Sequence, residues 1–104
     1  MRRRKYNLFP GILTVLESLG VRAWVTPDRL IAHDGDEELR EEIRQNIERV
    51  RPIGLRKTAL FFGAVLMVAM DRGTFTPADI ATLDHMGQGN ALYLLEKLEG
   101  NENA

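Results

Sequence analysis

Cysteine is absent from this chain of 104 residues, and only two histidines occur, His33 and His85. Without cysteine the protein has no disulfide, no thiolate nucleophile and no thiolate metal ligand, and two histidines are too few for a histidine-rich metal centre. A chain without disulfides is typical of an intracellular protein. We therefore expect a cytoplasmic protein that carries neither a metal nor another cofactor.

Long hydrophobic runs are also lacking. The longest one, residues 59–70, includes Gly63 and is too short to cross a bilayer, which takes about twenty apolar residues. The first residues, MRRRKY, are basic, but an amphipathic pattern with Glu17 and Arg22 follows them in place of the apolar core of a secretory signal. The sequence thus predicts no membrane partner, and it predicts a buried helix over residues 59–70.

The length is that of one domain, so we expect residues 1–104 to form a single compact domain. Its first half, residues 8–51, has the pattern of helix, hairpin and helix. Apolar residues recur at helical spacing before Gly20, a residue that suits a left-handed helix end. They recur at helical spacing again after residues 34–36, which end a strand and provide the cap of the next helix. These apolar positions are Phe9, Ile12, Leu13, Leu16 and Leu19 in the first helix and Leu39, Ile43, Ile47 and Val50 in the second.

Between these two helices the period of the pattern changes to two, which is typical of β-strands. The apolar positions of the first strand are Val21, Ala23 and Val25. Arg22 and Trp24 alternate with them, a turn with proline follows at residues 26–28, and residues 30–32 form the return strand. The sequence therefore predicts a β-hairpin between the two helices.

In the second half, residues 58–100, the pattern of apolar residues and helix-end signals predicts a bundle of about three helices. Pro52 and Gly54 separate it from the first half, and Gly73 ends the helix over residues 59–70. Thr76 then begins a second helix, because proline at the first helical residue and an acid at the third follow it.

The last helix follows a turn at residues 86–89 and begins at Asn90, which serves as its cap. It is expected to end before Gly100, and its apolar residues are Leu92, Leu94, Leu95 and Leu98. The fold class is therefore α+β and mostly helical: a helix, a hairpin and a helix, followed by the three-helix bundle.

The hairpin carries the candidate partner-binding residues. With Val21, Ala23 and Val25 directed inward, the opposite face holds Arg22 and Trp24, together with Arg29 or Ile31 from the return strand. An exposed tryptophan beside arginine, on a strand edge with unpaired main-chain groups, is typical of a surface that binds an extended peptide or a second copy of the chain. The alternative is that helices of the second half cover Trp24.

A nucleic-acid surface is the second possibility that the charges raise. Two basic clusters occur, Arg2, Arg3, Arg4 and Lys5 at the start and Arg51, Arg56 and Lys57 beyond the second helix. Residues 58–100 also resemble the helix-turn-helix of winged-helix proteins in outline. Against this hypothesis, Glu96 and Glu99 lie on the helix that would read DNA, where they repel phosphate.

Catalytic residues are not indicated by the sequence. His85 follows Asp84 directly, but adjacent residues on a helix point in different directions, and neither a nucleophile nor an oxyanion donor accompanies them. His33 is isolated in the same way. We therefore expect a protein that is not an enzyme.

The first half resembles a known family. Leu13, Leu16, Leu19-Gly20-Val21, Trp24, the turn at Pro27-Asp28, Leu30 and the run Leu39, Ile43, Ile47 are similar to the N-terminal docking domain of the TubC type. The resemblance covers about residues 8–50. It implies a homodimer whose exposed hairpin receives the C-terminal tail of a partner subunit, with the contact role at Arg22, Trp24, Arg29 and Ile31.

Two functional hypotheses follow from the sequence. The first is a non-enzymatic docking or adaptor module that forms a homodimer and binds a partner peptide or protein through the hairpin face. The alternative is a small DNA-binding regulator that uses the two basic clusters and the helix-turn-helix-like half.

Overall fold

The computed structural model describes residues 8–26, 29–87 and 91–102. Its elements, in chain order, are α1 (Phe9–Ser18), β1 (Arg22–Thr26), β2 (Arg29–Asp34), α2 (Glu37–Val50), the short 3-10 helix η1 (Arg51–Ile53), α3 (Lys57–Asp71), α4 (Pro77–His85) and α5 (Ala91–Glu102). The fold is α+β and mostly helical, as the sequence predicts.

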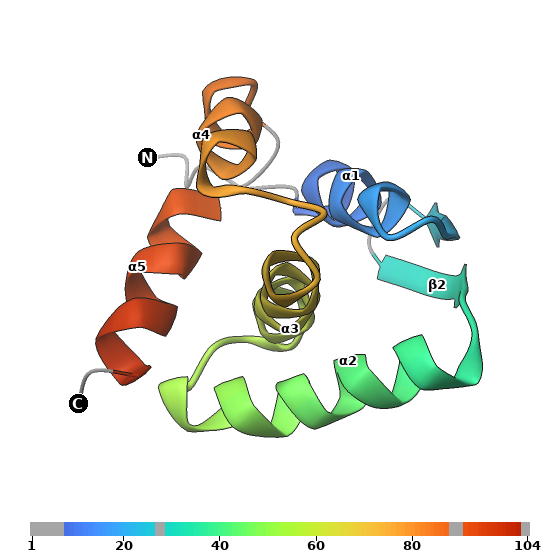
Figure 1. Cartoon of the computed structure of the whole chain (residues 1–104), viewed down its shortest axis with the longest axis horizontal. Helices are drawn as coiled ribbons and strands as arrows, with labels where there is room; N and C mark the ends of the chain where they lie inside the picture. Colours follow the sequence, from blue (N-terminus) through green and yellow to red (C-terminus); the bar gives the residue numbers. More distant parts are fainter. Residues whose placement is uncertain (1–7, 27–28, 88–90, 103–104) are drawn as a thin grey trace, which may run out of the picture.

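The central element is α3, which is apolar on nearly all sides. It packs against α1, α2 and α5, and its residues 62–69 are buried. Figure 1 shows α3 in the middle, with α2 along one side, α5 along another and α1 and α4 above it. A helix in this position contacts neighbours in several directions, and this explains why it lacks a polar face.

One hydrophobic core joins the two halves of the chain. It contains Ile12 and Leu16 of α1, Ile43 of α2, Phe62 of α3 and Leu94 of α5, all of them nearly inaccessible to solvent. The apolar face predicted for α1 did not include Val15, which is fully buried, whereas Leu13 and Leu19 are only partly buried. The core therefore includes residues of both halves.

Helix ends follow the local signals closely. Gly20 has φ 81° after α1, and Gly73 has φ 74° after α3, so both adopt the left-handed conformation that favours glycine. Asp36 caps α2 by accepting a hydrogen bond from the backbone N–H of Leu39 at 2.7 Å. At the start of α4, Thr76 and Asp79 form the reciprocal capping box.

The end of α5 differs from the prediction. The helix was expected to stop before Gly100, but it continues through this residue to Glu102. A glycine inside a helix costs only about 1 kcal/mol relative to alanine, which the neighbouring helical residues can offset. Gly100 therefore has no capping role.

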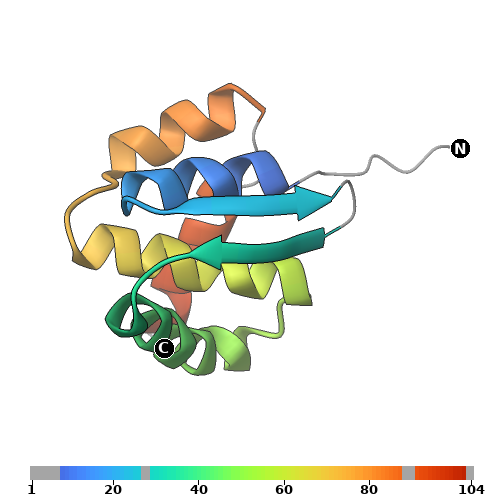
Figure 2. The ribbon, with the colours of Figure 1, turned by 90° about the vertical axis from the view of Figure 1, so that its right-hand side faces the viewer.

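The hairpin is the only sheet within the described residues, and it lies on one side of the helices. Figure 2 shows it in front of α1 and α3, on the side of the molecule away from α5. β1 and β2 are antiparallel, with a register shift between Trp24 and Val25. Among the described residues, no helix is long and apolar enough to cross a membrane.

Candidate interaction surface on the hairpin

Trp24 is exposed on the outer face of the hairpin. Half of its side-chain surface remains accessible, at 50%, and its neighbour Arg22 is also exposed. Val21 and Ala23, which alternate with these two residues, are partly buried and pack against the core. The structure thus answers the question that the sequence left open, because the helices of the second half do not cover Trp24.

On the inner face of the hairpin the structure describes the side chains of Ala23 and His33. Ala23 pairs with His33 across the sheet, and the His33 ring lies 6.2 Å from the ring of Phe61 on α3, measured between centroids. β1 also packs against α1. These contacts fix which face of the hairpin points outward.

The register places two residues of β2 opposite Arg22 and Trp24. Trp24 pairs with Ala32, and Arg22 pairs with Asp34. Sequence reasoning included Ala32 in the return strand but not among the contact residues, and it missed Asp34 because it treated this residue as a strand breaker. The strand in fact runs to Asp34.

Arg29 and Ile31, the other two predicted contact residues, hold different positions in the ladder. Arg29 pairs with Thr26 at the turn end of the hairpin. Leu30 and Ala32 pair with successive residues of β1, so Ile31 between them is the extra residue of a β-bulge. Their side chains lie outside the described part of the structure, and only their backbone positions relate them to Trp24.

A strand edge is the second component of this surface. In the described residues β1 and β2 pair only with each other, so each strand has one edge without a sheet partner. Unpaired edges expose main-chain N–H and C=O groups that a further strand can engage. Trp24 and these edges lie on the same small hairpin.

The second basic cluster is partly paired with an acid. Arg51 donates two hydrogen bonds to the carboxylate of Glu48, at 2.9 and 3.2 Å, and these bonds lower the pKa of Glu48. Arg56 and Lys57 are exposed at the start of α3. The first cluster, residues 2–5, lies outside the described residues.

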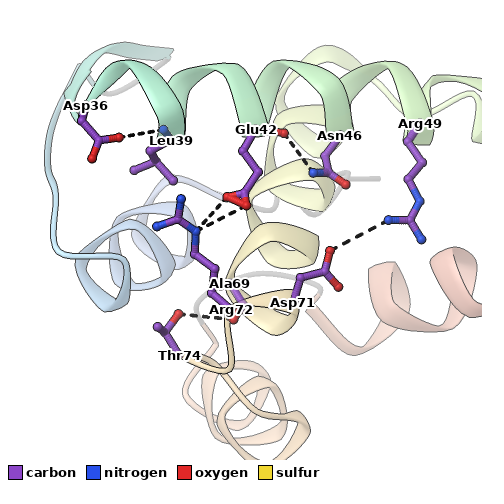
Figure 3. A network of polar contacts seen from close by, with 9 residues as sticks. All are labelled: Asp36, Leu39, Glu42, Asn46, Arg49, Ala69, Asp71, Arg72 and Thr74. Carbon is purple, nitrogen blue, oxygen red and sulfur yellow. Dashed lines mark hydrogen bonds and ion pairs between the residues drawn. The ribbon is translucent and has the colours of Figure 1, made fainter.

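Acids also accompany the arginines at the contact between α2 and the end of α3. Arg72 pairs with Glu42 at 2.7 Å, and Arg49 lies 4.0 Å from Asp71 (Figure 3). Beside this pair, the side chain of Asn46 donates to the backbone oxygen of Glu42, which satisfies its buried amide. The two pairs of opposite charge therefore connect α2 to the end of α3.

A second exposed apolar region lies near the junction of α4 and α5. Met86 is 62% exposed, Leu92 44% and Tyr93 53%. Lys97 lies over the ring of Tyr93, with its Nζ 5.3 Å from the centroid. Leu92 lies on α5, as the sequence predicts. The core, however, buries Ala91, Leu94 and Leu98 of this helix, and Leu92 remains exposed.

Groups of metal-ligating residues do not occur in the described part of the chain: nowhere do three or more histidine, aspartate or glutamate side chains come together. His85 remains exposed at the end of α4.

Comparisons with protein-family models, with curated proteins and with solved structures found no match to this chain.

Proposed function

We propose that this protein is a docking module without catalytic activity, which binds an extended segment of a partner protein along its hairpin and forms a homodimer. The observation that carries the proposal is the half-exposed Trp24 on a strand with an unpaired edge. Aromatic side chains and arginine are enriched at the centres of protein interfaces. A strand edge offers main-chain hydrogen bonds to a partner strand, while a large neighbouring side chain supplies specificity.

The charges near Trp24 favour a protein partner over nucleic acid. Arg22 lies opposite Asp34 in the ladder, so the outer face of the hairpin carries both signs. Elsewhere, Arg51 at the start of η1 is paired with Glu48 of α2. Binding to nucleic acid relies on cations that neutralise several phosphates, and these paired groups serve that purpose poorly.

The resemblance of residues 8–50 to the TubC N-terminal docking domain supports the same function. In that family an exposed hairpin receives the C-terminal tail of a partner subunit, and the domains are homodimers. The helix, hairpin and helix of that pattern correspond here to α1, β1, β2 and α2. The residues that take the contact role under this resemblance are Arg22, Trp24, Arg29 and Ile31.

Replacement of Trp24 by alanine tests the proposal. The accessible half of a tryptophan side chain is about 100 Å², and its burial in an interface is worth about 2.5 kcal/mol. We therefore expect Trp24→Ala to weaken dimerisation or peptide binding about 50-fold. Sedimentation equilibrium measures the dimer, and a displayed peptide library, selected on the wild-type protein, supplies ligands for titration.

Tyr93→Ala is the matched control. Tyr93 is 53% exposed, close to the value of Trp24, but lies on α5, which is on the opposite side of α3 (Figures 1 and 2). The proposal predicts that this variant keeps wild-type affinity. A monomeric protein from which no peptide with Trp24-dependent binding is selected would overturn it.

A third measurement separates docking from DNA binding. Fluorescence anisotropy of a labelled mixed-sequence duplex is recorded at about 50 and about 200 mM salt, between which several phosphate contacts would lose orders of magnitude in affinity. Tight binding that collapses with salt would replace the docking function by that of a small DNA-binding regulator. Absence of binding at both salt concentrations is the expected result.

A further inference from the structure

The described hydrophobic core lies mainly within the helices. Every fully buried apolar side chain that the structure describes belongs to a helix or to the loop at Phe75. Of the strand side chains that it describes, at positions 22–24 and 33–34, Ala23 packs against this core as a partly buried apolar residue. Segments of a protein can open locally at a small part of the free energy of global unfolding. Separation of the hairpin would leave the described buried side chains of the helices in place.

His33 is the polar residue among the described side chains on the inner face of the hairpin. It lies on the inner face of β2, with its ring against Phe61 of α3. Its Nδ1 is inaccessible to solvent, and no group among the described residues forms a hydrogen bond with it. A methyl group added to Gly35 would lie 3.4 Å from Nδ1, 3.3 Å from Val21 and 3.1 Å from Leu39, so two apolar side chains lie close to this side of the ring.

The charges around the imidazole oppose its protonation. Burial lowers the pKa of His33 most, the positive charge of Arg40 lowers it further, and Asp34 acts in the opposite direction. Arg40 is fixed close by, because its guanidinium donates to the backbone oxygens of His33 and Gly35. The facing residues of the other two elements, Phe61 on α3 and Ala23 on β1, carry no charge.

We propose that the contact between His33 and Phe61 holds the hairpin against α3 only while the imidazole is neutral, so that acid releases the hairpin from a helical core that remains folded. Protonation places an N–H donor and a positive charge at a buried atom that has no hydrogen-bond partner among the described residues. Opening of the hairpin lets water reach the imidazolium. The outer face with Trp24 loses its fixed position in the same step.

The proposed release in acid concerns the contact between the hairpin and α3. It does not depend on what the hairpin binds, and its test needs no partner. The chain offers two specific probes. Trp24 is the only tryptophan, so tryptophan emission, excited at a wavelength that the two tyrosines do not absorb, reports on the hairpin alone. Only two histidines are present, so NMR of the protein labelled with ¹⁵N-histidine resolves both rings, and a His85→Gln sample assigns them.

The experiment is a titration between about pH 8 and about pH 4.5, in which a histidine with the ordinary pKa of about 6.5 becomes charged. We expect His33 to titrate below the midpoint that the same ring shows in the urea-unfolded chain. The emission of Trp24 should change with the same midpoint as the His33 signals, while the far-UV circular dichroism of the helices stays constant. In His33→Phe, which keeps an aromatic ring and cannot be protonated, the emission change should be lost.

Three results would overturn the proposal. One is a His33 midpoint equal to that of the unfolded chain, and another is constant Trp24 emission while His33 becomes protonated. The third is loss of the helical signal together with the emission change, because acid would then unfold the whole protein. If His33→Phe does not fold, His33→Gln, which also stays uncharged, replaces it.

Discussion

Gly63 gives the sharpest test of how the helices pack. It lies in the middle of α3, where a glycine costs about 0.8–1.0 kcal/mol relative to alanine in a helix. A methyl group added there would lie 3.7 Å from Val50, 3.8 Å from Leu55 and 3.9 Å from Leu98. These are ordinary van der Waals distances, and the three neighbours come from α2, from the loop before α3 and from α5. The methyl group therefore enters the core without displacing any of them.

We expect Gly63→Ala to raise the free energy of unfolding by about 1 kcal/mol, since the gain in helix propensity is added to a small gain from the new contacts. For a domain of this size the melting temperature should rise by about 4–8 °C. Urea unfolding followed by circular dichroism measures the free energy, and a thermal scan measures the melting temperature.

Gly35→Ala is the contrasting variant. The methyl group would lie only 3.1 Å from Leu39 and 3.3 Å from Val21, so it crowds the corner between β2 and α2. Overpacking of this kind costs about 1–3 kcal/mol, which exceeds the entropic gain of up to about 1 kcal/mol from replacing glycine. We expect Gly35→Ala to be less stable than wild type.

For Gly63→Ala the opposite holds. A Gly63→Ala protein that is less stable than wild type would refute the arrangement of α2 and α5 around α3.

Two further predictions concern polar contacts. Thr76→Ala should lower the free energy of unfolding by about 1 kcal/mol at neutral pH, because it removes the cap of α4. The backbone N–H of Thr76, which alanine keeps, lowers the pKa of Asp79 most, and the Thr76 hydroxyl, which alanine lacks, lowers it further. The contribution of the hydroxyl is present above the pKa of this carboxyl in the unfolded chain and is lost as the pH falls through the folded pKa. The stability difference between Thr76→Ala and wild type should thus shrink in acid, and a difference that grows would contradict the capping box. Arg72→Ala removes the pair with Glu42, in which both side chains are about one third exposed, so it should cost less than about 1 kcal/mol in urea unfolding. Salt screens such a pair, so the loss of stability in Arg72→Ala should be smaller at high salt than at low salt. An equal loss at both salt concentrations would show that the guanidinium stabilises the contact in another way.

The candidate surface was only partly predictable. Alternation in β1 correctly placed Arg22 and Trp24 on the outer face, because neighbouring residues of a strand point to opposite sides. The pairing with Ala32 and Asp34 was not predicted, since a β-bulge shifts the register by one residue and leaves no clear signal in the sequence.

The sequence by itself determined where most helices begin and end. The left-handed turns at Gly20 and Gly73 and the caps at Asp36 and Thr76 depend on atoms a few residues away, so a short segment contains all the information they need. The end of α5 is the exception, because a glycine within a helix does not by itself stop it.

Tertiary structure alone decided which of the apolar and charged side chains remain in water. Trp24 is exposed because no helix of the second half lies over the outer face of the hairpin, and Leu92 is exposed because α5 turns Ala91 and Leu94 toward the core. Arg72 meets Glu42, thirty residues earlier in the chain, only after α2 and α3 have packed together. His33 owes its apolar surroundings to Phe61 in the same way. Burial and pairing of this kind depend on residues that are distant in sequence, and for that reason they follow from the assembled fold.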